Sequence, residues 1–490
     1  MNLLTKLSLD YGGELKPILL PSNLIEGKGI TNPSLIQVGN KTYMSLRQVD
    51  YTIYHSEGYV PYTTSIGTWF NFNREGPGPL WSRNYLCELD LNDLSIQNYE
   101  MIDEGDLFES PKSVWAGLED ARLMNWDGEL YVAGCKRDYQ EDAQGRIEIS
   151  KLNEHKVTKK LLASATDENS YCEKNWMPIE GMPWHFIKWT NPTELVKVNP
   201  ETGKTTLIKS IKQNIKSLTD LRGGSSLIKY KDYYVCVTHE ALYTTNSVGQ
   251  QSHSYYHRFI LWDKDFNIVK YSDAFKFLGF PIEFTCGLMF DGDRFIVPFG
   301  IYDSSSFLLT LTTDLFDYMV GLRENIPNNK STYNIDNPIS KVVNNPRDPD
   351  AVLELANLYH DNGYLSSSVP LFLKASMEYH LNGDLNSAYS TYSMIPEIVA
   401  FFPRNTMIRQ VLFSNLINFN IKRPEGYLGF ARYYLDIDQP YQALLMCKLG
   451  INSDYYLHDT DPTLIKLTKD HRKDLIELKT ILESKLFKQN

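Results

Sequence analysis

Residues 117–132 read GLEDARLMNWDGELYV and contain a pattern that recurs through most of the chain. Two acids, Glu119 and Asp120, open an apolar segment, the Asp127-Gly128 pair supplies a hairpin turn, and a second apolar segment follows. Degenerate copies of this arrangement start about 50 to 90 residues apart. The copies cover residues 32–44, 119–132, 174–178, 223–235 and 286–297. This repeat predicts a β-propeller, whose innermost strands deliver their first residues to one axial pocket.

Strand and turn signals continue through residues 1–325, which we predict to be one all-β region. Short β-branched and aromatic segments alternate with turn sequences such as NPETG at 199–203 and DGD at 291–293. A two-sheet β-sandwich with the same number of strands is the alternative that this pattern leaves open.

In the last third of the chain, the hydrophobic pattern changes from the alternation typical of strands to a helical periodicity. Residues 326–347, which contain three prolines among many Asn and Asp residues, are predicted to form a linker. In residues 348–490, small and aromatic residues recur at the offsets of a tetratricopeptide (TPR) helix pair. These residues are Ala356, Tyr359, Gly363, Phe372 and Ala375, then Ala431, Tyr434, Ala443 and Gly450. We predict a TPR-like α-helical domain for packing or partner docking, with a plain helical bundle as the alternative.

The composition narrows the classes of function. The 490 residues include 60 acidic and 49 basic side chains, a net charge of −11, which argues against nucleic-acid backbone binding. No apolar run of about 18 residues and no secretory signal pattern is present, so we expect no membrane partner and a cytoplasmic location. Six widely spaced cysteines show neither a disulfide framework nor metal-ligand spacing. We expect reduced thiols, no metal and no cofactor.

The polar residues that open the repeats are the candidates for a functional site. Strand alternation predicts that Asp120 and Arg122 share a face, so that the cation can set the protonation state of the acid. Arg222 with Gly223 and Gly224 offers backbone amides beside a fixed charge, which suits a phosphate or a sugar diphosphate. The other candidates are Lys174, His239, His257, Arg258, Glu283 and Asp303. Each candidate also has a structural alternative. Asp120 and Arg122 would form a surface ion pair, and Gly223 and Gly224 a bulge that requires glycine. His239 and His257 would be core histidines, and Glu283 and Asp303 would pair with a buried arginine.

An ordered set of motifs across residues 25–320 resembles the mannoside phosphorylases of glycoside hydrolase family 130 and their transferase relatives. The motifs are Asn32-Pro33 with Arg47, Gly117–Arg122, Glu173–Pro178, Gly223–Ser226, Thr238–Glu240, Phe284–Leu288 and Gly300–Asp303. The resemblance implies a five-bladed β-propeller and inverting chemistry at an anomeric carbon, with Asp120 as the acid/base. It assigns anionic charge to Arg47, Arg122, Lys174 and Arg222, and sugar hydroxyls to Asn32, Glu283 and Asp303. From the residues at and near the repeat openings we also predict substrate contacts for Glu119, Asn175, Gly223, Gly224, His239, His257 and Arg258.

Three departures from the family pattern bear on the substrate. Ala121 stands where the family usually has proline, and residues 173–178 differ from the family's phosphate-contacting segment. The residues that follow Glu240 also differ and read YYHRF at 255–259. We therefore predict an inverting glycosyltransferase that moves a mannose-like hexosyl residue from a sugar phosphate or nucleotide sugar to a glycan or glycosylated acceptor. The alternatives are a β-mannoside phosphorylase that releases a sugar 1-phosphate, and a non-catalytic glycan-binding scaffold. A protein partner is expected at the helical domain.

Overall fold

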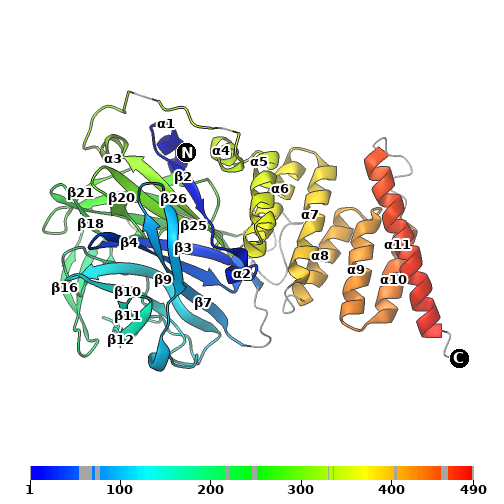
Figure 1. Cartoon of the computed structure of the whole chain (residues 1–490), viewed down its shortest axis with the longest axis horizontal. Helices are drawn as coiled ribbons and strands as arrows, with labels where there is room; N and C mark the ends of the chain where they lie inside the picture. Colours follow the sequence, from blue (N-terminus) through cyan, green and yellow to red (C-terminus); the bar gives the residue numbers. More distant parts are fainter. Residues whose placement is uncertain are drawn as a thin grey trace.

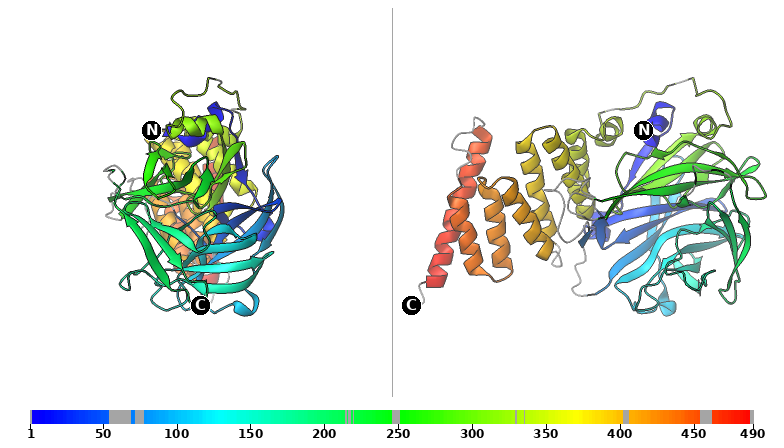
Figure 2. Two further views of the ribbon diagram at one scale, coloured as in Figure 1. Left: turned by 90° about the vertical axis from the view of Figure 1, so that its left-hand side faces the viewer. Right: turned by 180° about the vertical axis from the view of Figure 1, so that it is seen from behind.

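The chain folds into a rounded β-rich body and a row of helices that extends from it (Figure 1). The N-terminus lies on the β-rich body, and the C-terminus lies at the far end of the helical row, as two further views also show (Figure 2). The fold is thus mixed β and α. The computed structural model describes residues 2–53, 69–71, 78–213, 215, 218, 220–245, 251–328, 330–334, 336–401, 406–453 and 462–487.

The largest sheet consists of two antiparallel meanders joined side by side. The first meander contains β3 (Gly29–Val38), β4 (Lys41–Val49), β7 (Leu80–Asp90) and β8 (Ser95–Met101). The second contains β9 (Trp115–Trp126), β10 (Glu129–Lys136), β11 (Arg146–Asn153) and β12 (Lys156–Leu162). Parallel pairing of β7 with β9 joins them. The predicted hairpin turns at residues 39–40 and 127–128 lie between paired strands, which confirms that part of the repeat.

Three further sheets continue the antiparallel pattern. One contains β13 (Met177–Pro178), β14 (His185–Trp189), β15 (Thr193–Val198) and β16 (Thr205–Ile211). The next contains β17 (Arg222–Gly223), β18 (Ile228–Tyr230), β19 (Tyr233–Thr245), β20 (Gln251–Trp262), β21 (Ile268–Tyr271) and β22 (Phe275–Lys276). The last contains β23 (Glu283–Phe284), β24 (Met289–Phe290), β25 (Arg294–Ile301) and β26 (Ser305–Thr312). A separate two-stranded ribbon pairs β5 (Tyr51–Ile53) with β6 (Trp69–Asn71).

Two N-terminal strands complete sheets whose other strands come from much later in the chain. β2 (Leu15–Ile18) pairs antiparallel with β26, so that Leu15 lies opposite Leu309. β1 (Asn2–Leu3) pairs in parallel with β22. The two ends of the β-rich body are therefore held together by backbone hydrogen bonds.

Most of the helices lie in the last third of the chain. The N-terminal part contains α1 (Leu4–Asp10), α2 (Ser22–Ile25), the short 3₁₀ helix η2 (Gly105–Leu107) and α3 (Thr313–Met319). The row contains α4 (Pro338–Asn344), α5 (Pro349–Asp361), α6 (Leu365–Leu381), α7 (Leu385–Ala400), α8 (Thr406–Phe419), α9 (Pro424–Asp436), α10 (Pro440–Ile451) and α11 (Pro462–Phe487). Successive helices pack on one another, and glycine allows close crossings. At Gly429 on α9, an added Cβ would lie 2.3 Å from Cε1 of Phe413 on α8.

The helical row packs directly on the β-rich body. The Tyr364 hydroxyl donates a hydrogen bond of 2.6 Å to the Leu20 carbonyl, and the Phe307 ring on β26 contacts the Tyr359 ring on α5. One continuous hydrophobic core extends from the sheets through α5, α6 and α7 into α8. The two parts of the chain thus share a core.

The segment 326–347, which we predict to be a linker, contains the helix α4. The Asn337 side chain accepts a hydrogen bond of 2.8 Å from the Ser340 amide and caps the helix, and Pro338 occupies its first turn. Proline is well suited to that position because the amide there has no helical partner. Val342 and Val343 of α4 are fully buried, so the segment is part of the packed structure.

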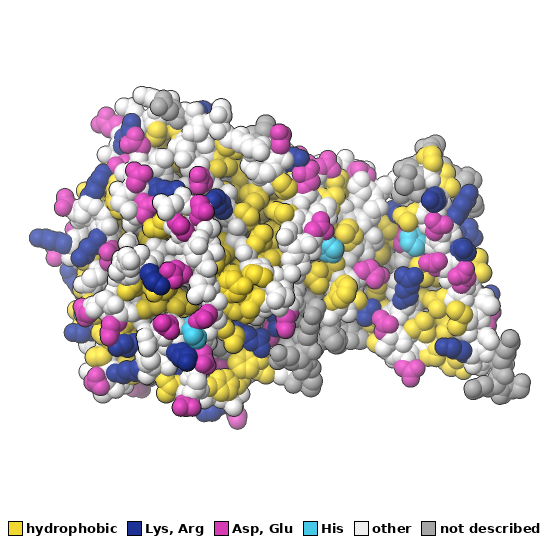
Figure 3. Space-filling model, viewed as in Figure 1, with side chains coloured by type: hydrophobic (Ala, Val, Ile, Leu, Met, Phe, Trp, Pro, Cys, Tyr) yellow, Lys and Arg dark blue, Asp and Glu magenta, His cyan; other side chains and the backbone are white. Residues whose placement is uncertain are grey.

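The surface in Figure 3 shows acidic, basic and hydrophobic side chains interspersed over both the β-rich body and the helical row. Basic residues do not gather into one large patch on this face. In the described part of the chain, no helix combines the length and the apolar character needed to cross a membrane.

Candidate functional site

The polar residues that open several of the strand repeats meet at one cavity of about 390 Å³. They come from strands or strand ends in different sheets, which the sequence repeat predicts. The sequence-predicted residues that line the cavity are Asn32, Arg47, Glu119, Asp120, Lys174, Asn175, Arg222, His239 and Asp303. The cavity therefore holds both acidic and basic groups in a small volume.

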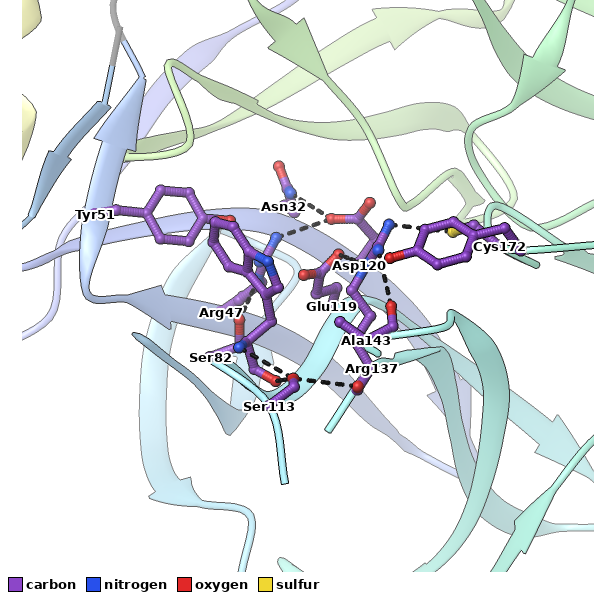
Figure 4. Close-up of polar contacts among 12 residues, drawn as sticks. Asn32, Arg47, Tyr51, Ser82, Ser113, Glu119, Asp120, Arg137, Ala143 and Cys172 are labelled. Atoms are coloured by element: carbon purple, nitrogen blue, oxygen red, sulfur yellow. Dashed lines mark hydrogen bonds and ion pairs between the residues drawn. The ribbon is translucent and has the colours of Figure 1, made fainter. Parts of the chain in front are cut away.

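Asp120 is held by two donors that reach the same carboxylate oxygen (Figure 4). Asn32 Nδ2 lies 2.7 Å and Arg47 Nη1 lies 3.0 Å from Asp120 Oδ1. Arg47 also donates to the Ser82 hydroxyl at 3.0 Å and to the Tyr51 hydroxyl at 2.8 Å, so its guanidinium is fixed on three sides. Within the described residues, no hydrogen bond reaches Asp120 Oδ2. The second oxygen is thus free to meet a ligand.

A shared backbone conformation positions four of the lining residues. Asn32, Asp120, Asn175 and Asp303 have positive φ angles of 50°, 52°, 60° and 50°. Among residues other than glycine, Asn and Asp tolerate this left-handed region best. Such strained positions concentrate at functional sites, where the surrounding structure holds them in place. The recurrence of Asn and Asp at these openings therefore has a backbone reason as well as a chemical one.

The predicted side-chain pairing of Asp120 with Arg122 is wrong. The register between β9 and β10 shifts at Asp120, where three steps from Glu119 to Arg122 match two steps from Cys135 to Ala133. This bulge breaks the strand alternation on which the prediction rested. Arg122 is instead buried beneath the cavity and donates to the backbone carbonyls of Asp120 and Gly224, each at 2.7 Å. It supports the floor, and Arg47 is the cation that pairs with the Asp120 carboxylate.

Asp303 differs from an ordinary surface acid. Burial raises the pKa of Asp303 to about 6, against the lowering effect of Arg47, and the negative charges of Asp120 and Glu119 raise it further. A side-chain hydrogen bond with Asn32 lowers it. The Asn32 amide thus lies between the two aspartates and orders both.

Cationic side chains line another part of the same cavity. Lys174 is exposed to it, and within the described residues no acidic side chain lies within ion-pair distance of Lys174. Arg222 donates a 3.0 Å hydrogen bond to the Tyr243 hydroxyl, and its nearest acid, Asp220, is 3.8 Å away. Burial lowers the pKa of His239 well below its usual value, so this imidazole is neutral beside the cations. The arrangement can accept an anion that bears more than one charge.

Three other predicted site residues do not line the cavity. Glu283 is fully buried and accepts hydrogen bonds from the amides of residues 277, 278 and 280, so its expected contact with a sugar is replaced by a structural role. His257 is fully buried 4.8 Å from the Phe277 ring, and burial lowers its pKa to about 3. Arg258 donates to the Ser272 carbonyl at 3.1 Å. His257 is thus a core residue, as its structural alternative predicts, whereas the partners of Glu283 are backbone amides rather than the buried arginine of its alternative.

The two glycines after Arg222 are required by close packing. A Cβ on Gly223 would lie 2.0 Å from the Asn175 carbonyl oxygen, and one on Gly224 would lie 2.4 Å from the Val237 carbonyl oxygen. Neither residue lines the cavity. The prediction that their amides cradle a phosphate is therefore replaced by a packing role, in which they bring neighbouring sheets together behind the cavity wall.

The sequence argument missed several residues that line the cavity. These are Tyr51, Trp115, Arg137, Tyr243, His253, Tyr255, Ile282 and Phe284. Arg137 directly follows β10, the hairpin partner of β9, so the register of that hairpin was the signal that could have placed it beside Glu119. Its Nε lies 3.6 Å from Glu119 Oε2. Several of these lining residues are aromatic, and flat aromatic faces suit the apolar face of a sugar ring.

No protein-family model matches the chain, and no curated protein matches its sequence. Among solved structures, MPT-4, a mannose phosphorylase from Leishmania mexicana, is 14% identical with a TM-score of 0.37 over 63% of this chain and 92% of that one. A β-1,2-mannobiose phosphorylase from Listeria innocua is 10% identical with a TM-score of 0.37 over 63% and 94%. MPT-1, a GDP-Man-dependent mannosyltransferase from Leishmania mexicana, is 10% identical with a TM-score of 0.36 over 63% and 92%. These values are too low to assign the chain to a family.

Proposed function

We propose that the protein is an inverting glycosyltransferase that moves a mannose-like hexosyl residue from a phosphate-bearing donor to a glycan or glycosylated acceptor. One observation carries the proposal: a single cavity holds Asp120 with an open carboxylate oxygen, together with the cations Lys174 and Arg222. An acid and an anion site in one pocket supply the two functions that displacement at an anomeric carbon needs.

The proposed step uses Asp120 as a base in the transfer direction. The acceptor hydroxyl gives its proton to Asp120 while its oxygen forms the new bond to the anomeric carbon. The bond from that carbon to the donor phosphate oxygen breaks on the opposite face, and the phosphate keeps the electron pair. Lys174 and Arg222 balance its charge. In the reverse direction, protonated Asp120 returns the proton to the glycosidic oxygen.

We propose transfer rather than hydrolysis because Lys174 and Arg222 supply an anion site, which a hydrolase that uses water does not need. An inverting hydrolase needs a second carboxylate about 6.5 to 9.5 Å from the acid to activate water, whereas an incoming hydroxyl or phosphate attacks without one. Two further carboxylates line the cavity: Glu119, which pairs with Arg137 at 3.6 Å, and Asp303, whose pKa burial raises to about 6 and which shares the Asn32 amide with Asp120. We assign Asp303 and Asn32 to the sugar hydroxyls.

The finer description of the fold belongs to the same proposal. We propose that the antiparallel meanders over residues 1–325 are the five blades of a propeller, with the cavity on its axis. We further propose that the helices of residues 348–490 form a TPR-like array, which offers a surface for a protein partner or a large acceptor. The successive packing of the helices and the convergence of strand openings support this description.

The test is a mass-spectrometric donor screen with wild type, Asp120→Asn and the matched control Asp127→Asn. Asp127 lies on the same hairpin but in an exposed turn outside the cavity. Mannose 1-phosphate and GDP-mannose are the first donors to compare. We expect transfer with wild type and the control, and a loss of at least about 10²-fold in Asp120→Asn, because the proton acceptor is removed.

Full activity of Asp120→Asn would overturn the assignment of the base. Release of a sugar 1-phosphate from a β-mannoside only when inorganic phosphate is added would identify a phosphorylase. Glycan binding without turnover of any donor would identify a binding scaffold.

A further inference from the structure

Cys135 and Cys172 lie together behind the cavity wall, although they are far apart in sequence and show no motif spacing. Cys135 is buried on β10, and half-buried Cys172 precedes β13, where it forms an isolated bridge with Gly145. The glycine leaves room for both sulfurs. A Cβ on Gly145 would lie 2.6 Å from Cys172 Sγ and 3.0 Å from Cys135 Sγ. The two thiols therefore point into the same small space.

An arginine links this thiol pair to the cavity (Figure 4). Arg137 Nη2 lies 3.1 Å from Cys172 Sγ, and Arg137 Nη1 donates to the Ala143 carbonyl at 3.3 Å. On its other edge, Arg137 Nε lies 3.6 Å from Glu119 Oε2. A guanidinium in direct contact with sulfur favours the thiolate, which is the reactive form of cysteine.

The environment of the two sulfurs makes them unequal. A hydrogen bond shared with Cys135 lowers the pKa of Cys172, and the charges of Arg137 and Lys174 lower it further. The same hydrogen bond and burial raise the pKa of Cys135. A nucleophilic, partly exposed thiolate beside a protonated thiol is the arrangement of a reactive cysteine with its resolving partner.

We propose that Cys172 and Cys135 are a site of reversible thiol oxidation, at which a peroxide converts Cys172 to a sulfenic acid and Cys135 closes a disulfide. In the first step, Cys172 sulfur bonds to a peroxide oxygen, the O–O bond breaks, and the departing hydroxide takes up a proton to become water. In the second step, Cys135 sulfur loses its proton and bonds to Cys172 sulfur, and the S–O bond breaks to release a second water.

Oxidation at this site changes the charge beside the cavity. The disulfide carries no negative charge, so Arg137 loses its contact with the thiolate and retains Glu119 as its acidic partner. Glu119 lines the cavity next to Asp120. Oxidation of the two cysteines therefore changes the charge near the cavity through Arg137, which contacts both Cys172 and Glu119. The thiol chemistry itself does not depend on the function proposed for the cavity.

The test follows the thiols of the full-length protein directly. The reduced chain is treated with graded hydrogen peroxide, quenched with a maleimide, digested and examined by mass spectrometry. We expect a loss of two reactive thiols, a peptide pair linked through Cys135 and Cys172, and full reversal by dithiothreitol. Cys447, which is buried in α10 with a raised pKa, should react far more slowly and serves as the internal reference.

Two variants separate the steps. Cys135→Ser should accumulate a Cys172 sulfenic acid that dimedone traps, because the resolving thiol is gone. Cys172→Ser should leave Cys135 as an unmodified thiol. Absence of the linked peptide in wild type would overturn the proposal, as would oxidation of Cys172 no faster than that of Cys447. Both results are measured on the wild-type protein, so they do not depend on the folding of a variant.

Discussion

Asp303 connects the charge of the cavity to the stability of the protein. Burial raises its pKa to about 6 from an ordinary value of 3.8. Between about pH 4 and pH 6 the folded chain therefore holds a proton that the unfolded chain has released. Stability contributed by this group falls as the pH rises through that window, because an acid with a raised pKa is more costly to ionise in the folded state.

We expect Asp303→Asn to remove this pH dependence. The free energy of unfolding of the variant, minus that of wild type, should increase between about pH 4.5 and pH 7 by at most about 1.4 kcal/mol for each unit of the pKa shift. Urea unfolding at the two pH values measures the difference. For the control Asp127→Asn, in an exposed turn, the unfolding free energy relative to wild type should be the same at both pH values. If the value for Asp303→Asn is also the same at both, the proposed ionisation of Asp303 is contradicted.

At the level of single residues, the sequence predicted which positions open the strands but not which side chains meet. Asp120 and Asn32 were identified from the repeat, yet the partner of Asp120 is Arg47 rather than Arg122. The bulge in β9 causes the difference, and an alternating pattern contains no sign of one extra residue. Glu283 was also misassigned, because backbone amides that satisfy a buried carboxylate are invisible in sequence.

Among the structural elements, α8 and α9 depend on a glycine for their close approach. An added Cβ at Gly429 would lie 2.3 Å from the Phe413 ring, whereas one at Gly426, on the same helix, would come no closer than 3.2 Å to any neighbour. Alanine in place of an interior glycine such as Gly429 gains about 1 kcal/mol of helix propensity. Gly426 lies in the first turn of α9, where this gain is smaller, so a lower stability of Gly429→Ala would come from the steric contact.

We expect Gly429→Ala to be less stable than Gly426→Ala by about 1 to 3 kcal/mol, because overpacking forces the helices apart. Thermal unfolding followed by circular dichroism measures this difference in the full chain. Equal melting temperatures for the two variants would show that the crossing of α8 and α9 relaxes without cost.

The helices also show how far local sequence signals extend. Helical periodicity correctly predicted the elements after residue 348 in the described part of the chain, and Asp348 caps α5 through hydrogen bonds from the amides of Asp350 and Ala351. The same rules could have found α4, since Asn337-Pro338 is a cap followed by a first-turn proline. Proline is common both in linkers and in the first turn of a helix, and here the burial of Val342 and Val343 distinguishes the two.

At the scale of the whole molecule, the shared core predicts that the β-rich body depends on the first helices of the row. A chain ending at residue 325 lacks α4 to α7 and leaves Phe307 and the surrounding core without its cover. A chain ending at residue 420 keeps those helices and α8, which also contributes to the shared core.

We expect the 1–420 chain to unfold cooperatively near the melting temperature of the full protein. The 1–325 chain should melt at a lower temperature and bind a hydrophobic dye, because burial of apolar surface is the main source of stability. Differential scanning fluorimetry and dye binding compare the three chains. A 1–325 chain that melts like the full protein would show that the two parts fold independently.

The pairing of β2 with β26 has a consequence for biosynthesis. Residues 15–18 leave the ribosome early, but their strand partner, residues 305–312, is made almost 300 residues later. The sheet that contains β2 and β26 therefore cannot be completed until the intervening sheets have been translated. Closing so long a loop is entropically slow, so the final closure is a late event of folding. Asp303 lies in the turn between β25 and β26, so the strand that joins the two ends of the β-rich body directly follows the cavity's second aspartate.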